Sequence, residues 1–183
     1  TGMSEKKAGP NIGKLVIVLT LVCAITSAIL GGVNAITCDR IAQITKAKTD
    51  AALAEVLPIE ANDSYTELSD FTADSTVTHV WTAEAGTVVE MNISGAQGMI
   101  DLVVGVDKDG AVTGVSIISH GETPGLGAKA TENSFRDQFI GATGSVAVDK
   151  DGGSIQALTG ATITSRAIAN AVNTAIDTAA TLG

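Results

Sequence analysis

The apolar residues of this chain follow three patterns, one after another. An uncharged run from Leu15 to Thr37 comes first. Between Val77 and Ile118 apolar and polar residues alternate, and from Ala167 to Ile176 apolar residues return every three or four positions. These patterns predict, in that order, a long hydrophobic helix, half-buried strands and an amphipathic helix. We therefore expect an α+β fold behind a single N-terminal hydrophobic helix.

The uncharged run is long enough to cross a hydrocarbon core of about 30 Å as a helix. Lys6, Lys7 and Lys14 precede it, and basic residues before a first span favour retention in the cytoplasm. We assign residues 1–14 to a cytoplasmic tail and 15–37 to a transmembrane helix, so the remaining chain is expected to be extracytoplasmic.

A cleaved signal peptide is the alternative for this run, because Val33-Asn34-Ala35 resembles a small-residue cleavage site. The run exceeds the roughly 7–15 apolar residues of a signal core, which favours a retained anchor. Cys23 and Cys38 lie in or beside the run, and their spacing matches neither a disulfide framework nor a metal site.

Residues 38–76 are interpreted as a linker. Apolar residues recur at helical spacing up to Val56, which predicts an amphipathic helix that ends before Pro58. Residues 59–76 are rich in Asp, Ser, Thr and Asn, which is typical of a surface connection or a short extended piece.

Residues 77–183 are predicted to form the globular domain. Two strand candidates lie in 77–94, and two more flank a turn at Asp107-Lys108-Asp109-Gly110, which together predict an antiparallel meander. The acids of this turn resemble the start of a calcium loop, but Ile118 stands where the loop needs its last carboxylate, so a hairpin turn is favoured.

Two further elements are expected between the meander and the last helix. Thr131 is placed to cap a short helix that bears Phe135 and Phe139, and residues 145–150 are a strand candidate. The domain thus combines an antiparallel sheet with flanking helices.

Composition limits the classes of partner and cofactor contact. The formal net charge is −9, which disfavours nucleic acid because phosphates require a basic surface. Aromatic residues make up 3% of the chain, so a cofactor would meet few rings.

The segment TGATITS, residues 159–165, is predicted to join a strand to the last helix. A helix start presents unpaired N–H groups and the positive end of the dipole, which stabilise a phosphate. Gly160 permits close backbone approach, and hydroxyls crowd the turn. Plain helix capping by Thr or Ser is the alternative interpretation.

TGATITS resembles the S/T-G-A-T-x-T/S motif of the FMN-binding domain family, found in the G subunit of Rnf electron-transport complexes and in the C subunit of the sodium-pumping quinone oxidoreductase. The resemblance implies that the last motif threonine, here Thr164, carries FMN through a phosphoester. The adjacent Ser165 is the alternative attachment position. Thr159, Gly160, Ala161 and Thr162 form the preceding turn.

A second segment, HGETPGLG followed by Ala128 and Lys129, is similar to the same family's H-x-E-T-P-G-L-G signature. Its glycines, including Gly127, let backbone approach a flat ring, Thr123 can bond polar flavin edges, and Leu126 can cover a ring face. The carboxylate of Glu122 would oppose a negatively charged flavin, whereas the cation of Lys129 would favour it. A single His120 without a partner is given no catalytic role.

The resemblance implies a function. The chain is expected to relay electrons through covalent FMN in an ion-translocating ferredoxin:NAD oxidoreductase complex, without catalysing a complete reaction alone. Its expected partners are the other membrane, iron–sulfur and flavin subunits, together with a flavin transferase that attaches FMN. The alternatives are a quinone-oxidoreductase component similar to the C subunit, a stand-alone flavin reductase and a noncatalytic membrane-anchored binding module.

Overall fold

The computed structural model describes residues 12–59, 63–69 and 71–182 of the chain. The chain forms two units, residues 1–45 and residues 46–183, and each is described by itself. Helix α1 (Ile12–Val56) begins in the first unit and ends in the second.

The first unit consists, in its described part, of α1 up to Thr45. Its large apolar side chains are exposed: Val16, for example, is 57% exposed and Leu30 70%. By length and composition, the helix is long and apolar enough to cross a membrane. The predicted span at 15–37 and the predicted linker helix lie in this one helix, because no Pro or Gly occurs between Asn34 and Pro58.

The second unit is built on a five-stranded sheet. All neighbouring strands are antiparallel and follow chain order, so the predicted meander is confirmed. In the turn between the last two strands, the Asp107 carboxylate accepts the N–H groups of Asp109 and Ala111, which is a hairpin turn. The strands are β1 (Thr66–Glu67), β2 (Val77–Ala83), β3 (Gly86–Ser94), β4 (Met99–Asp107) and β5 (Val112–His120).

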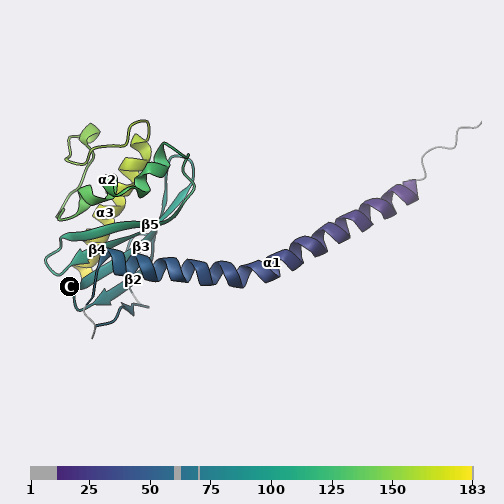
Figure 1. Cartoon of the computed structure of the whole chain (residues 1–183), viewed down its shortest axis with the longest axis horizontal. Coiled ribbons are helices and arrows are strands. Elements are labelled where there is room, and N and C mark those ends of the chain that lie inside the picture. The colour runs from purple at the N-terminus through teal and green to yellow at the C-terminus, as the bar shows by residue number, and fades with distance from the viewer. Residues whose placement is uncertain (1–11, 60–62, 70, 183) are drawn as a thin grey trace, which may run out of the picture. The chain divides into compact units, whose positions relative to one another are not determined.

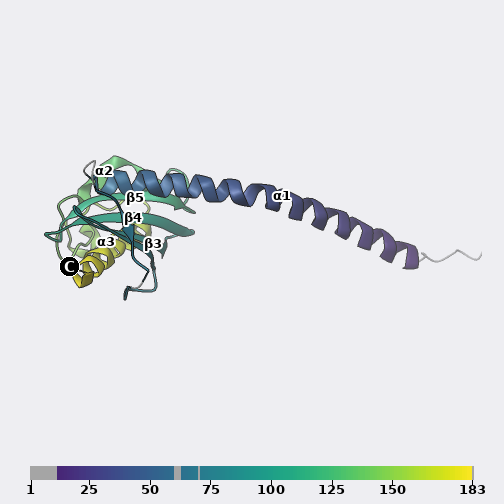
Figure 2. The same cartoon turned by 90° about the horizontal axis from the view of Figure 1, so that it is seen from below.

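Helix α3 (Thr162–Leu182) covers one face of the sheet, as Figures 1 and 2 show. Strand side chains such as Met91 and Leu102 pack there against Ile168 and Val172 in the main core. Phe135 and Phe139 complete this core and meet edge to face, with ring centroids 5.4 Å apart. The predicted amphipathic helix therefore buries its apolar face on the sheet.

The last turns of α1 cover the other face. Leu53 and Val56 pack with Val88 and Val103 of the sheet in a second, smaller core. Gly105 and Gly114 leave room for this helix end, because a Cβ built on either would lie 2.5–3.0 Å from backbone atoms of Val56. The sheet is thus held between two helices.

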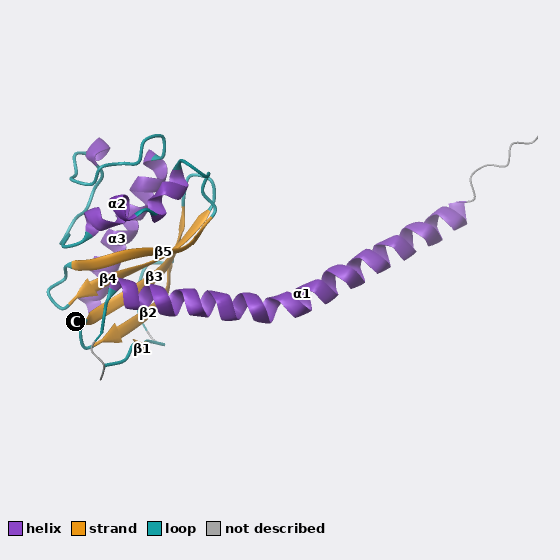
Figure 3. Ribbon diagram, in the orientation of Figure 1, coloured by secondary structure: helices purple, strands orange, loops and turns teal. Residues whose placement is uncertain are grey.

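The segment between β5 and α3 is mostly loop, with short helical turns (Figure 3). They are η1 (Gly127–Thr131), α2 (Asn133–Arg136), η2 (Asp137–Phe139) and η3 (Asp149–Asp151).

Two local predictions in this segment are wrong. Thr131 ends η1 and donates its hydroxyl to Ala128, while Glu132 is the N-cap residue of α2. Residues 145–150 form no strand, because Val148 meets only Ile155 in an isolated bridge. The turn at 159–161 therefore follows a loop instead of a strand.

Candidate functional site

The two sequence motifs meet at the start of α3. The Thr164 hydroxyl donates a 2.6 Å hydrogen bond to a Glu122 carboxylate oxygen, although the two residues are 42 positions apart. Both side chains are buried: Thr164 is 0% exposed and Glu122 6%. The loop after β5 and the first turn of α3 therefore form one site.

Glu122 is a buried carboxylate held by neutral donors. The N–H of Gln97 donates to its other oxygen at 3.0 Å. Burial by itself would raise the pKa of this carboxyl, but hydrogen bonds from Gln97, Thr164, Gly98 and Ala96 outweigh burial and lower the pKa. Glu122 therefore stays ionised at neutral pH.

Glycines make room for this carboxylate. A Cβ built on Gly95 would lie 2.2 Å from one Glu122 oxygen, and a Cβ on Gly127 would lie 2.1 Å from the other. Gly160 has a φ of +76°, a backbone conformation that favours glycine. A Cβ built on Gly160 would lie 3.1 Å from the Leu126 side chain. Leu126 of one motif therefore touches the glycine turn of the other.

The hydroxyls of the TGATITS turn have three different environments. The Thr164 hydroxyl is hydrogen-bonded to Glu122. The Ser165 hydroxyl, also buried, accepts the N–H of Leu158 and donates to the carbonyl of Ala161, each at 3.0 Å. The Thr162 side chain is half-buried, and none of the residues that the structure describes hydrogen-bonds to its hydroxyl.

The backbone of this turn is open to an anion. Helix α3 starts at Thr162, and its first helical hydrogen bond runs from the Ser165 N–H to the Ala161 carbonyl at 3.0 Å. The N–H groups of Thr162, Ile163 and Thr164 therefore have no partner within the helix. These groups and the helix dipole favour a phosphate at this end.

The remaining predicted site residues differ in their exposure to solvent. Thr123, Leu126, Lys129 and Thr159 are exposed, whereas Ala161 is buried. Two features were not predicted from the sequence: the 95–98 turn that binds Glu122, and Ile163, which is 63% exposed. The glycine pair Gly95 and Gly98 was the available signal for the first.

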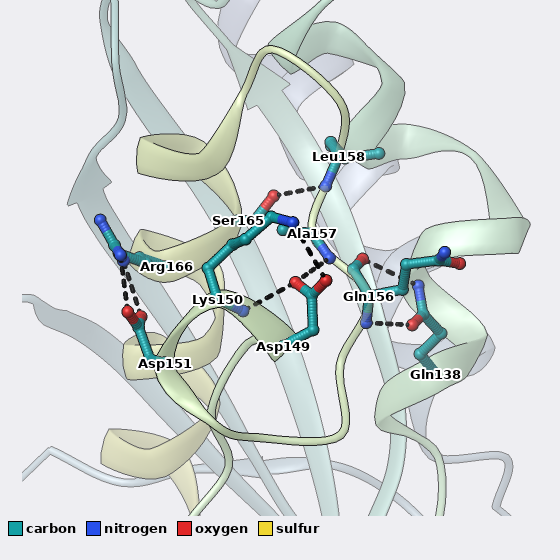
Figure 4. Close-up of polar contacts among 9 residues, drawn as sticks. All are labelled: Gln138, Asp149, Lys150, Asp151, Gln156, Ala157, Leu158, Ser165 and Arg166. Atoms are coloured by element: carbon teal, nitrogen blue, oxygen red, sulfur yellow. Dashed lines mark hydrogen bonds and ion pairs between the residues drawn. The ribbon is translucent and has the colours of Figure 1, made fainter.

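A polar network fixes the loop that leads into the turn (Figure 4). Arg166 of α3 forms two 2.6 Å contacts with the carboxylate of Asp151. Asp149 accepts the N–H of Ala157, and Gln138 accepts the N–H of Gln156 at 2.7 Å. The loop is thereby held on both sides before it reaches Leu158.

Comparison with known proteins decides the family. The FMN-binding domain model matches residues 95–177. The G subunit of the ion-translocating oxidoreductase complex of Methanosarcina acetivorans is 31% identical over 184 residues, which cover 96% of each chain. The chain belongs to this G-subunit family.

Another G subunit, from the Na⁺-translocating ferredoxin:NAD⁺ oxidoreductase complex of Acetobacterium woodii, is 31% identical over 89% of each chain. Among solved structures, the C subunit of the Na⁺-translocating NADH-quinone reductase of Parabacteroides distasonis covers 72% of this chain and 79% of its own. Its sequence is 21% identical to this chain, and the two structures superpose with a TM-score of 0.45.

The range that matches the FMN-binding domain model contains every part of the site. The Glu122 loop, the turn before α3 and the 95–98 turn all lie within 95–177. Within the described residues, no three His, Cys, Asp or Glu side chains gather closely enough to hold a metal ion. The groups that the site presents are hydroxyls, backbone N–H groups and one buried carboxylate.

Proposed function

We propose that this chain is a membrane-anchored flavoprotein subunit that passes electrons through FMN within an ion-translocating ferredoxin:NAD oxidoreductase complex. The observation that carries the proposal is the meeting of the two family motifs, through the Glu122–Thr164 hydrogen bond and the contact between Leu126 and Gly160. Neither contact is needed for capping alone, which would involve only the residues of the turn.

The residues fit FMN at the start of α3. The unpaired N–H groups of Thr162 and Ile163 would hold the phosphate, and Gly160 leaves the turn without a side chain in front of it. Leu126 offers exposed apolar surface beside the turn, and Thr123 and Lys129 offer polar groups on the same loop. Bound FMN would supply reversible electron transfer; the chain supplies position and electrostatics.

We further propose that FMN is attached covalently, through a phosphoester on this turn. The sequence pattern pointed to Thr164, but burial and hydrogen bonding favour Thr162 as the acceptor. Thr164 is 0% exposed and committed to Glu122, so its oxygen must leave that bond before it can attack a phosphorus. The half-buried Thr162 hydroxyl needs no such rearrangement.

Ser165 is disfavoured for a related reason. Its hydroxyl closes the turn by bonding both Leu158 and Ala161, so modification there would disrupt the loop that presents the site. An unactivated hydroxyl is a poor nucleophile, and we expect a separate flavin transferase that uses FAD to perform the attachment. The hydroxyl oxygen would bond to the FMN-side phosphorus of FAD as the pyrophosphate bond breaks, and AMP and the hydroxyl proton would leave.

The partners and the orientation are part of the proposal. The family is that of a complex subunit, so the remaining membrane and redox subunits are the expected donors and acceptors of electrons. The apolar part of α1 would anchor the chain, with the basic N-terminal flank in the cytoplasm and the FMN-binding domain outside.

The test is flavin incorporation into the full chain coexpressed with a flavin transferase. We expect one covalent FMN by intact mass and a yellow protein, with incorporation lost in Thr162→Ala and retained in Ser154→Ala, a control that removes an exposed hydroxyl outside the motif. FMN incorporation should also be retained in Thr164→Ser, which keeps the hydroxyl. A colourless wild-type chain beside an active transferase would contradict the proposal and favour a noncatalytic binding module.

A further inference from the structure

We propose that Glu122 is a positioning residue of the site: its ionised carboxylate ties three segments together and sets a fixed negative charge beneath the flavin. The three segments are the 95–98 turn, the 121–127 loop and the first turn of α3. We call this arrangement the Glu122 clamp. Its role toward the flavin rests on the proposed function, whereas its role in holding the segments does not.

The clamp uses both oxygens of one carboxylate. One oxygen accepts the N–H of Gln97 and the other accepts the hydroxyl of Thr164. The 95–98 turn is itself closed by a 2.8 Å hydrogen bond from the Gly95 N–H to the Gly98 carbonyl. Gly95 and Gly127 face the two oxygens so closely that any side chain there would displace the carboxylate.

The charge of the clamp has no cation beside it. Within the part of the chain that the structure describes, no ion pair includes Glu122, and its hydrogen bonds come from backbone N–H groups and a hydroxyl. Lys129, on the same loop, is exposed to solvent. A buried charge without a counter-ion acts on its surroundings with little screening.

At 6% exposure, Glu122 is buried, and Gly127 and Thr164 of the two motifs lie against one of its carboxylate oxygens. It therefore acts through Thr164 and the loop backbone instead of touching the cofactor. Because reduction adds negative charge to a flavin, this carboxylate opposes reduction and lowers the reduction potential.

The first arm of the test needs no FMN. Hydrogen exchange of the full chain in detergent micelles is compared among the wild type, Glu122→Gln and Glu84→Gln, in which an exposed carboxylate loses the same charge. We expect faster exchange in Glu122→Gln at residues 95–98 and 165–168 together, and wild-type exchange in Glu84→Gln. Unchanged exchange at both segments would overturn the clamp.

If Glu122→Gln does not accumulate as a folded chain, Thr164→Val replaces it in the hydrogen-exchange comparison. It removes one donor and keeps the carboxylate, so exchange should rise at 121–127 and at the start of α3, more than at 95–98. Exchange equal to the wild type at all three segments would again overturn the proposal.

The second arm uses the FMN-loaded chains and measures the midpoint potential. Glu122→Gln should shift the potential to a more positive value than the wild type, whereas Glu84→Gln should not. A Glu122→Gln potential equal to that of Glu84→Gln would refute the electrostatic role. A wild-type chain that takes up no FMN would refute the proposed function alone, since the exchange comparison still decides the clamp.

Discussion

Gly127→Ala should destabilise the domain although it adds a single methyl group. Gly127 is buried, and a Cβ built there would lie 2.1 Å from a Glu122 oxygen and 2.9 Å from the Thr164 hydroxyl oxygen. The backbone at this position is not left-handed, so the effect is steric and not conformational.

The structure sets the size of the effect. Overpacking by one methylene in a tight site costs about 1–3 kcal/mol. Relief requires the Glu122 carboxylate to move, which breaks its 2.6 Å hydrogen bond to Thr164, and a bond to a charged group contributes about 1.5–3 kcal/mol. Because the same movement serves both terms, they do not add fully, and we expect a loss of about 2–4 kcal/mol.

Trp81 provides the assay. It is the one tryptophan of the chain and packs against the smaller core beneath the end of α1. Urea unfolding in detergent micelles, followed by its fluorescence, gives the free energy of unfolding of the domain. Lys129→Ala, an exposed change in the same short helix, should stay within about 0.5 kcal/mol of wild type. A Gly127→Ala loss no larger than that control would refute the packing around Glu122.

Three further changes should have graded effects. Glu90→Gln should raise the melting temperature near neutral pH, because burial and neighbouring acids raise the pKa of Glu90 and its ionised form is therefore unfavourable. The gain in melting temperature should vanish at a pH below the ordinary carboxyl range, where Glu90 is as neutral as the glutamine that replaces it. Arg136→Met removes the 2.9 Å contact to Glu55 at the end of α1 and should cost roughly 1–2 kcal/mol of unfolding free energy in the Trp81 assay. Arg166→Gln removes the exposed pair with Asp151, so the melting temperature should change little, and the change should disappear at high salt.

Local sequence patterns predicted the parts of the fold that they determine. Alternation along β2 to β5 and the helical spacing of α3 place the core residues correctly, because each element buries one face. The strand expected at 145–150 failed because alternation alone supplies no partner strand: Val148 finds only Ile155. Thr131 failed as a cap because its hydroxyl bonds backward to Ala128.

The candidate site was predictable in its composition but not in its internal arrangement. Both motifs could be recognised, and the structure joins them through Glu122 and Thr164. The sequence could not show that Glu122 bonds the last threonine of the motif. Glu122 is also held by the 95–98 turn, whose Gln97 lies 25 positions before it, and such a distant contact leaves no local pattern. Burial, which separates Thr162 from Thr164, is a property of packing and not of spacing.

The most direct test of the account is to locate the flavin on the chain. Trypsin releases residues 151–166 as one peptide, which contains all three candidate hydroxyls. Fragmentation of this peptide from the chain coexpressed with a flavin transferase should place one FMN on Thr162 and leave Thr164 and Ser165 unmodified. FMN on Thr164 would contradict the assignment made from burial, and a peptide without FMN would contradict the electron-carrier function itself.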